Sequence, residues 1–141
     1  MASLFDLKIV ACDGIFYEGK CEILVFPGAD GEAAILNHHE VFTGIVEIGE
    51  IRFKTGEGEM RKAIISDGLV SVNMDGSVTV VAYSCERPED IDTFRAQEAL
   101  ERAQEQLQQK QSRIEYQIST NNMARAMARL KGAGAKNLYK I

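Results

Sequence analysis

The sequence predicts an α+β fold, in which an N-terminal antiparallel β-sandwich is followed by a C-terminal hairpin of two antiparallel helices. Every valine and 10 of the 12 glycines lie in residues 1–84, whereas residues 77–131 hold no glycine and a single proline. β-Branched residues suit strands and glycine permits tight turns, while the Ala, Gln, Glu, Leu and Arg residues of the second part favour helices. The charge changes at the same point, because residues 1–84 carry 6 basic and 13 acidic side chains and residues 85–141 carry 10 and 8. We therefore predict two domains, 1–84 and 85–141.

The composition excludes several classes of protein. With 141 residues, 45% of them hydrophobic and 26% charged, the chain has the content of an ordinary globular protein rather than of a disordered one. Its apolar runs are too short to span a membrane, and we expect no signal peptide before Leu4. Three cysteines without CxxC spacing argue against a disulfide scaffold or a zinc ribbon and favour a reducing compartment. The net charge of −5 argues against a general nucleic-acid-binding protein.

Short apolar segments separated by turn residues predict the strands of the first domain. Asp13-Gly14 and Asp75-Gly76 are the clearest hairpin signals, because Asp-Gly suits the positive φ of a two-residue turn. Many short strands at this spacing are typical of a sandwich or a flattened barrel, although the pattern alone does not give the strand order. The expected strands are Leu4–Ala11, Ile15–Tyr17, Cys21–Phe26, Ala33–Leu36, Gly44–Gly49, Ile51–Lys54, Arg61–Ser66, Leu69–Val72 and Val78–Val81.

The second domain has two helix starts. Pro88, followed by two acidic residues, suits the first turn of a helix, where proline is tolerated and acids complement the helix dipole. Ser112 with Glu115 has the spacing of a capping box, so a second helix is expected from there to just before Gly132. The alternative is one helix from Pro88 to Lys131, but a hairpin buries more apolar surface and we prefer it. The expected inward residues recur at helical intervals: Phe94, Leu100, Ala103, Leu107 and Ile114 can form one apolar stripe, and Tyr116, Met123, Met127 and Leu130 point inward from the second helix.

The sequence holds no common catalytic motif. A Walker-type loop, a nucleophile elbow and an HExxH segment are all absent. His38, His39 and Glu40 could be read as metal ligands, but adjacent residues of a strand point to opposite faces, so a loop pair is the better interpretation. The Asp-Gly pairs lack the spacing of a calcium loop. Cys12 and Cys21 lie in expected strands, where a small buried hydrophobic residue is the default.

Four arginines of the second domain form the main candidate site. Arg95 and Arg102 are two turns apart on one face of the first helix. Arg125 and Arg129 are one turn apart on the second helix, and residues 116–141 contain five basic and no acidic residues. If the helices fold together, these guanidinium groups can converge on a phosphate-bearing ligand.

Two other interpretations of the arginines stay open. In the first, they pair with Asp92, Glu98 and Glu105 or remain solvated, as most surface charges do. In the second, the basic helix docks against an acidic partner surface, where complementary charge speeds association.

Several motifs, taken in order and spacing, resemble those of the epsilon-subunit family of bacterial F-type ATP synthases, over residues 7–130. The motifs are Ala11, Asp13, Gly14, Tyr17 and Gly19; Gly31-Glu32 with Ile35-Leu36 and His38; Ser66 to Val72; Glu86 to Asp92 with Arg95-Ala96; and Ala126 to Leu130. Each motif is weak alone, but their order and their coincidence with the change from strands to helices make the combination specific. The segment from Leu36 to Phe42 lacks two prolines that the family usually has. The resemblance therefore leaves open which contacts this segment makes with partner subunits.

This resemblance implies a ten-stranded β-sandwich and a two-helix C-terminal domain. It implies a non-catalytic central-stalk (rotor) subunit of a proton-translocating ATP synthase, whose sandwich binds the gamma subunit and the c-ring of the membrane sector. The C-terminal helices would contact the catalytic beta and the alpha subunits and inhibit ATP hydrolysis. The protein would be peripheral on the cytoplasmic face of the cell membrane, with no nucleic acid and no direct membrane insertion. The alternative is a free-standing nucleotide-sensing or adaptor domain outside a rotary ATPase.

The resemblance also implies a regulatory ligand. Some members of the family bind ATP in the folded hairpin through an Ile/Leu-Asp-x-x-Arg-Ala motif, which is present here from Ile91 to Ala96. No cofactor is required, and no catalytic or metal-binding residue is implied. The candidate ATP-binding residues are Glu86, Ile91, Asp92, Arg95, Ala96, Arg102, Arg125 and Arg129.

Overall fold

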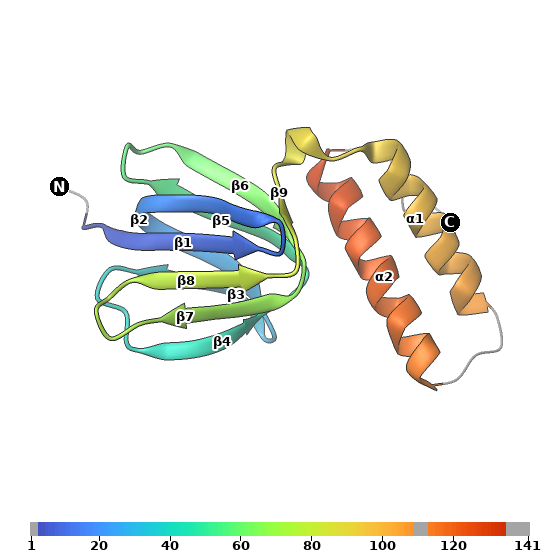
Figure 1. Ribbon diagram of the computed structural model, residues 1–141, viewed down its shortest axis with the longest axis horizontal. Coiled ribbons are helices and arrows are strands. Elements are labelled where there is room, and N and C mark those ends of the chain that lie inside the picture. Colours follow the sequence, from blue (N-terminus) through green and yellow to red (C-terminus); the bar gives the residue numbers. More distant parts are fainter. Residues whose placement is uncertain (1–2, 109–112, 135–141) are drawn as a thin grey trace. The chain divides into compact units, whose positions relative to one another are not determined.

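The computed structural model of the protein describes residues 3–108 and 113–134. The chain divides into two units, Met1–Arg87 and Pro88–Ile141, and each unit has its own cluster of buried apolar side chains. A β-sandwich followed by two helices is confirmed (Figure 1).

The first unit is a sandwich with nine strands among its described residues. They are β1 (Phe5–Ala11), β2 (Gly14–Gly28), β3 (Gly31–Leu36), β4 (Phe42–Val46), β5 (Gly49–Thr55), β6 (Met60–Ile65), β7 (Gly68–Val72), β8 (Val78–Ala82) and β9 (Cys85–Glu86). Their order is β4-β7-β8-β1-β2-β5-β6-β9, and β3 pairs with β2 beside this path. The resemblance implied ten strands. Where the sequence predicts two strands before Pro27, β2 is continuous, because Gly19 stays paired with Leu7 across the expected break.

Two details of the sheet differ from the sequence prediction. β1 and β8 are parallel, with Leu7–Val10 beside Val78–Val81, whereas the other strand pairs among the described residues are antiparallel. The short β9 was not predicted. It pairs with the end of β6 and places the division between the units after Arg87 rather than near residue 85.

The Asp-Gly signals mark real hairpin turns at three places. Gly14, Gly31 and Gly76 have φ values of 138°, 115° and 88°, which non-glycine residues rarely adopt. Gly68 serves a different purpose. A Cβ there would lie 2.1 Å from the carbonyl oxygen of Val81, so glycine is needed for β7 to approach β8.

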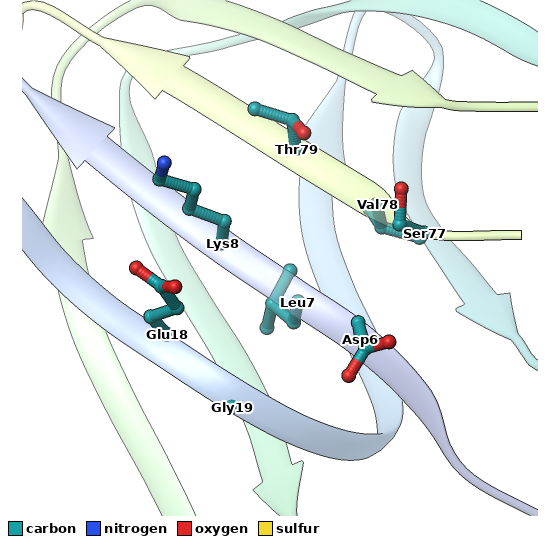
Figure 2. Close-up of a pocket in the computed structure, with 8 residues that line it drawn as sticks. All are labelled: Asp6, Leu7, Lys8, Glu18, Gly19, Ser77, Val78 and Thr79. Carbon is teal, nitrogen blue, oxygen red and sulfur yellow. The ribbon is translucent and has the colours of Figure 1, made fainter. Parts of the chain in front are cut away.

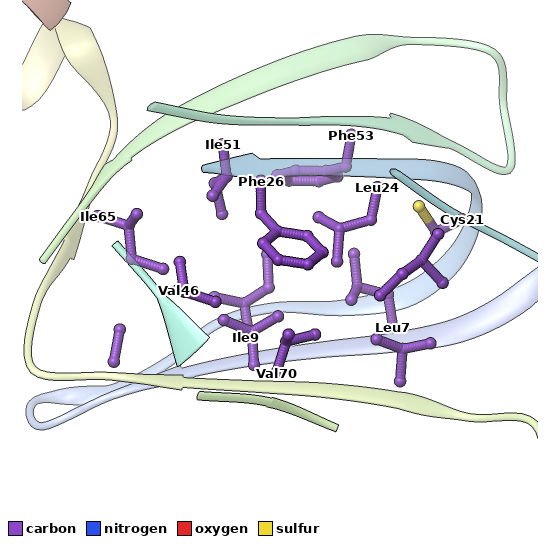
Figure 3. Packing of buried hydrophobic residues seen from close by; sticks show 14 of the residues in the cluster. Leu7, Ile9, Cys21, Leu24, Phe26, Val46, Ile51, Phe53, Ile65 and Val70 are labelled. Carbon is purple, nitrogen blue, oxygen red and sulfur yellow. The ribbon is translucent and has the colours of Figure 1, made fainter. Parts of the chain in front are cut away.

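The core of the sandwich is formed by alternate side chains of its strands. On β1 the residues Phe5, Leu7, Ile9 and Ala11 are buried and the residues between them are not. Figure 3 shows Leu7 and Ile9 among side chains from the other strands. The facing residues include Leu24, Phe26, Val46, Ile51, Phe53, Ile65 and Val70. Burial of each such side chain stabilises the fold by about 1.5–3 kcal/mol, which fixes the strand register.

The three cysteines differ in exposure. Cys21 is buried, as the sequence predicts, but Cys12 is exposed because it lies in the β1–β2 turn rather than within a strand. Burial raises the pKa of the Cys21 thiol to about 11. Burial, with the nearby carboxylates of Glu86 and Asp13, raises the pKa of the Cys85 thiol to about 12. Both buried thiols are therefore protonated at neutral pH.

We expect iodoacetamide at pH 8 to modify Cys12 in the folded chain and to leave Cys21 and Cys85 unmodified. The thiolate is the reactive form, and a raised pKa keeps it scarce until the pH approaches 11. Mass spectrometry should find one modified cysteine per native chain and three per chain in denaturant. Modification of Cys85 in the native chain at the rate of Cys12 would contradict the packing around β9.

The second unit contains a short 3₁₀ turn (Pro88–Asp90), α1 (Thr93–Gln108) and α2 (Arg113–Gly132), which confirms the hairpin over a single long helix. The expected start of the first helix at Pro88 is wrong by five residues, because Pro88 begins the 3₁₀ turn instead. α2 ends at a turn in which Gly134 has φ 76° and donates a hydrogen bond to the carbonyl of Lys131, at 3.1 Å. The expected cap at Ser112 lies outside the described residues.

Most of the expected inward residues are confirmed. Leu100, Ala103 and Leu130 are buried, and Leu107, Met123 and Met127 are partly buried. The expectation is wrong for Phe94 and Tyr116, which are 71% and 54% exposed. Phe94 lies two residues before the buried Ala96, so it projects roughly 200° away from the interface. The side chain of Ile114 lies outside the described residues.

Candidate functional site

Asp92 begins the candidate site by capping α1. Its carboxylate accepts a hydrogen bond from the backbone N–H of Arg95 at 3.2 Å, and its carbonyl accepts one from the N–H of Ala96 at 3.0 Å. This is the ordinary geometry of an aspartate N-cap. Ile91, just before it, is buried. The motif from Ile91 to Ala96 therefore contributes to folding whether or not it binds a ligand.

The two helices pack through small and apolar side chains. Ala96 and Leu100 of α1 are buried against Ala126 and Leu130 of α2. Alanine at two of these four positions leaves little side-chain bulk between the helices. Further along the hairpin, the Ser119 hydroxyl donates to Gln106 Oε1 at 3.4 Å, which fixes the antiparallel register. Ala96 is fully buried in this interface, so its place in the motif is explained by packing.

The four candidate arginines lie on one side of the hairpin. Each of them directly precedes an inward residue: Arg95 precedes Ala96, Arg102 precedes Ala103, Arg125 precedes Ala126, and Arg129 precedes Leu130. Each arginine is therefore rotated by about 100° in the same sense from its helix's buried face. In an antiparallel pair, this rotation brings the residues of both helices to the same side. We call these four residues the arginine flank.

Within the arginine flank, the two helices hold their side chains differently. Arg95 and Arg102 of α1 are exposed, and neither forms an ion pair with another described residue. Arg125 and Arg129 of α2 are half-buried, and their Nε atoms are buried. Arg125 Nη1 donates to Asn122 Oδ1 at 3.3 Å. Of the alternative in which the arginines pair with acidic neighbours or remain solvated, Arg95 and Arg102 show the solvated form in the described part of the chain.

Glu86 is the remaining candidate residue, and it lies in the other unit. It is the second residue of β9, pairs with Ile64 of β6 and is half-buried. The helical unit thus provides seven of the eight candidate residues, and its arginine flank is the group that the fold of a single unit brings together.

The histidine pair lies in the loop between β3 and β4, as the sequence predicts. His38 has φ 67°, and its N–H donates to Asn37 Oδ1 at 3.0 Å. The ring of His39 lies 5.4 Å from the ring of Phe42. These local contacts order the loop without the two prolines. Over the described residues, no three metal-ligating side chains gather at one place.

The sandwich carries a shallow surface pocket of about 450 Å³. Figure 2 shows it on the outer surface of β1, β2 and β8, with Lys8 beside Glu18 and Thr79. Lys8 is the cross-strand neighbour of both residues. The Ser77 hydroxyl at the pocket donates to Asp75 Oδ1 at 2.6 Å, and the same oxygen accepts from the Ser77 N–H, which is a local contact of the β7–β8 turn. The charges of Lys8 and Glu18 are the ordinary cross-strand charges of an exposed sheet.

A row of apolar side chains crosses the same outer face of the sheet. The strand register places Ile45 opposite Leu69, Leu69 opposite Val81, Val81 opposite Val10, and Val10 opposite Ile15. Ile45, Leu69, Val81 and Ile15 are 60%, 52%, 52% and 56% exposed, and Val10 is half-buried. Figure 1 shows β4, β7, β8 and β1 side by side along this face. We call these five residues the apolar row.

The apolar row contrasts with the exposed residues of β2, β3 and β5. There, Arg52 pairs with Glu32 at 2.6 Å, and Lys54 pairs with Glu22 at 3.2 Å. Soluble monomers rarely expose large contiguous apolar patches, so the row is a candidate contact surface. It was not predicted from the sequence, because it depends on the pairing of strands that are distant in the chain.

Comparison with known proteins identifies the class to which this architecture belongs. Residues 4–88 match the family described as "ATP synthase, Delta/Epsilon chain, beta-sandwich domain", and residues 89–134 match "ATP synthase, Delta/Epsilon chain, long alpha-helix domain". The chain therefore belongs to the ATP synthase delta/epsilon family.

Curated relatives agree over nearly the whole chain. The chain is similar to the ATP synthase epsilon chain of Ruminiclostridium cellulolyticum, with 35% identity over 96% of this chain and 99% of the relative. It is also similar to the ATP synthase epsilon chain of Caldanaerobacter subterraneus subsp. tengcongensis, with 38% identity over 93% of this chain and 94% of the relative.

Solved structures share the fold at low identity. One is a chain of the Euglena gracilis mitochondrial ATP synthase OSCP/F1/c-ring, with a TM-score of 0.77 and 19% identity over 94% of this chain and 82% of that chain. Another comes from the central stalk/c-ring of the Tetrahymena thermophila mitochondrial ATP synthase, with a TM-score of 0.68 and 8% identity over 94% of this chain and 98% of that chain. In the described part of this chain, neither helix is long and apolar enough to cross a membrane.

Proposed function

We propose that this chain is a non-catalytic rotor subunit in the central stalk of a proton-translocating F-type ATP synthase. Its sandwich binds the gamma subunit and sits on the c-ring, so that ring rotation is coupled to the catalytic head. The observation that carries this proposal is the apolar row, taken together with membership of the ATP synthase delta/epsilon family. On this proposal the protein is peripheral on the cytoplasmic face of the cell membrane, and it is held there by its partner subunits.

The geometry of the apolar row suits a rigid protein partner, such as a helix. Five side chains on five adjacent strands extend over about 19 Å, at roughly 4.8 Å per strand. A row of this length that runs across the strands matches the apolar stripe of a helix of about 13 residues, at 1.5 Å per residue. We assign the gamma subunit to this face, and we assign the c-ring to the loop between β3 and β4.

The test of the rotor assignment is assembly. We expect the chain to co-purify with the gamma subunit of the same organism as a stable complex in size-exclusion chromatography. A chain that elutes alone in the presence of folded gamma subunit would contradict the proposal and would favour a free-standing nucleotide-sensing domain.

We further propose that the helical unit regulates the complex. Its helices contact the catalytic beta and the alpha subunits when they leave the folded hairpin, and this contact restrains ATP hydrolysis. The hairpin interface is small, with four buried residues at its centre, so opening it costs little compared with unfolding the sandwich. A ligand that binds only the folded hairpin shifts the equilibrium toward it by the difference in affinity between the two states.

ATP is the proposed regulatory ligand of the folded hairpin, bound by the arginine flank with the motif from Ile91 to Ala96. Four guanidinium groups on one side of two packed helices suit a triphosphate, since arginine binds phosphate oxygens in a bidentate manner. The acidic residues nearby do not neutralise Arg95 and Arg102 within the described residues, so both remain available to a ligand.

We expect Arg125→Ala to weaken ATP binding by roughly 10- to 150-fold, because a charge-assisted hydrogen bond is worth about 1.5–3 kcal/mol. Calorimetric titration of the full chain with ATP measures this loss of affinity. Lys131→Ala, which removes a charge from the last turn of α2 outside the arginine flank, should change the affinity little. If the unaltered chain binds no ATP at millimolar concentration, the nucleotide site is wrong while the rotor assignment stands.

A further inference from the structure

Asn122 lies on the same side of the hairpin as the arginine flank and contacts one of its members. It directly precedes Met123, which packs against the buried cluster, so it is rotated from the helix interface in the same sense as the arginines. Its Oδ1 accepts the hydrogen bond from Arg125 Nη1, at 3.3 Å. The two residues are three apart on α2, which is a spacing at which side chains meet on one face of a helix.

We infer that Asn122 is a positioning residue, which holds the Arg125 guanidinium in place for the phosphates of the nucleotide. This inference rests on the ATP site proposed above. Arginine has a long side chain that loses rotamer freedom when a ligand fixes it. A hydrogen bond that restricts Arg125 before the ligand arrives reduces this loss and so raises affinity.

The neutrality of the Asn122 amide is part of the argument. An amide oxygen orients a guanidinium without bringing a negative charge, whereas a carboxylate at the same position would add one. That added negative charge would repel a phosphate-bearing ligand. An asparagine therefore suits a site for a di- or triphosphate, and an aspartate would not.

Thr120 provides a matched control. It also makes an intrahelical hydrogen bond on α2, because its Oγ1 donates to the carbonyl oxygen of Tyr116 at 2.9 Å. It directly follows the buried Ser119, so it is rotated by about 100° from the interface in the opposite sense to the arginine flank. Substitution of Thr120 therefore removes an intrahelical hydrogen bond on the other side of α2 from Arg125.

The experiment is calorimetric titration of the full chain with ATP. We expect Asn122→Ala to weaken binding by about 3- to 10-fold, which is the typical cost of immobilising one rotamer-rich side chain, here Arg125, when the ligand binds. Asn122→Asp should weaken binding further, although it can still accept the hydrogen bond from Arg125. Thr120→Ala should bind as the unaltered chain does. Thermal melts followed by circular dichroism should show that Thr120→Ala and Asn122→Ala both keep the helix content of the unaltered chain.

A double-mutant cycle separates positioning from a general effect on the helix. In a chain that already carries Arg125→Ala, or Arg125→Lys if binding becomes too weak to measure, Asn122→Ala should cause no further loss. An equal loss in both backgrounds would overturn the inference, and so would ATP binding by Asn122→Asp at the unaltered affinity. If every Asn122 variant binds ATP like the unaltered chain, this inference alone fails. If the unaltered chain does not bind ATP, the proposed nucleotide site fails and the inference with it.

Discussion

The variant Leu69→Lys is expected to lose its complex with the gamma subunit. Leu69 is an interior member of the apolar row on β7, between Ile45 of β4 and Val81 of β8. A charge at this position would be buried against an apolar partner surface without a counter-ion. Disruption of a desolvated contact within an interface costs about 2 kcal/mol or more, which is roughly a 30-fold loss of affinity.

The substitution should leave the sandwich itself folded. The Leu69 side chain is 52% exposed, so a lysine can direct its ammonium group to solvent in the free chain. The inward neighbour Val70, which belongs to the core, is unchanged. The melting temperature of Leu69→Lys should therefore stay close to that of the unaltered chain.

Met74→Lys is the matched control for this experiment. Met74 is the most exposed large apolar residue of the sandwich's described part, at 93%, and it lies in the β7–β8 turn outside the apolar row. The Met74→Lys variant should bind the gamma subunit as the unaltered chain does, both in size-exclusion chromatography and in titrations of purified subunits. Equal binding of the gamma subunit by the Leu69 and Met74 variants would show that the apolar row is not part of the interface.

The local features of the fold could be predicted from the sequence, and the long-range ones could not. Asp13-Gly14 and Asp75-Gly76 predict hairpins because the turn chemistry is contained in the two residues themselves. The parallel pairing of β1 with β8 joins residues that are distant in the chain, and no local signal encodes it. The apolar row depends on that pairing, since Val81 meets Val10 only there.

The sequence predicts the helices to a similarly limited extent. Composition predicts two helices, and the spacing of the arginines predicts that each pair shares a face. The inward positions depend on which face meets the other helix, and the apolar character of Phe94 and Tyr116 was a poor guide to it. Small residues determine which faces point inward instead, because Ala96 and Ala126 allow the helices to pack closely. Asn122 was missed, since an asparagine in a helix has no sequence signal of its own.

A chain that ends after Arg87 is expected to fold and to bind gamma, and to release ATP hydrolysis in the assembled complex. The buried cluster of the sandwich lies entirely within residues 5–85, and no residue of the helical unit belongs to it. Ending the chain after Arg87 rather than after Ser84 keeps β9, which pairs with Ile64 and Ile65 of β6. A cut after Ser84 would instead remove the strand partner of Ile64 and Ile65 and leave that end of β6 as an open edge.

The expected rise in hydrolysis follows from the proposed role of the helices. On this proposal the helices restrain the catalytic subunits. Their removal should therefore raise the rate of ATP hydrolysis several-fold, while the contact between the sandwich and the gamma subunit stays the same. The rate should be measured in complexes assembled with the full chain, with the chain ending after Arg87, and with full-length Arg125→Ala. The last of these retains the helices but binds ATP weakly, so it should hydrolyse ATP no faster than the complex with the full chain. An unchanged rate on truncation, with gamma still bound, would show that the helical unit does not restrain hydrolysis.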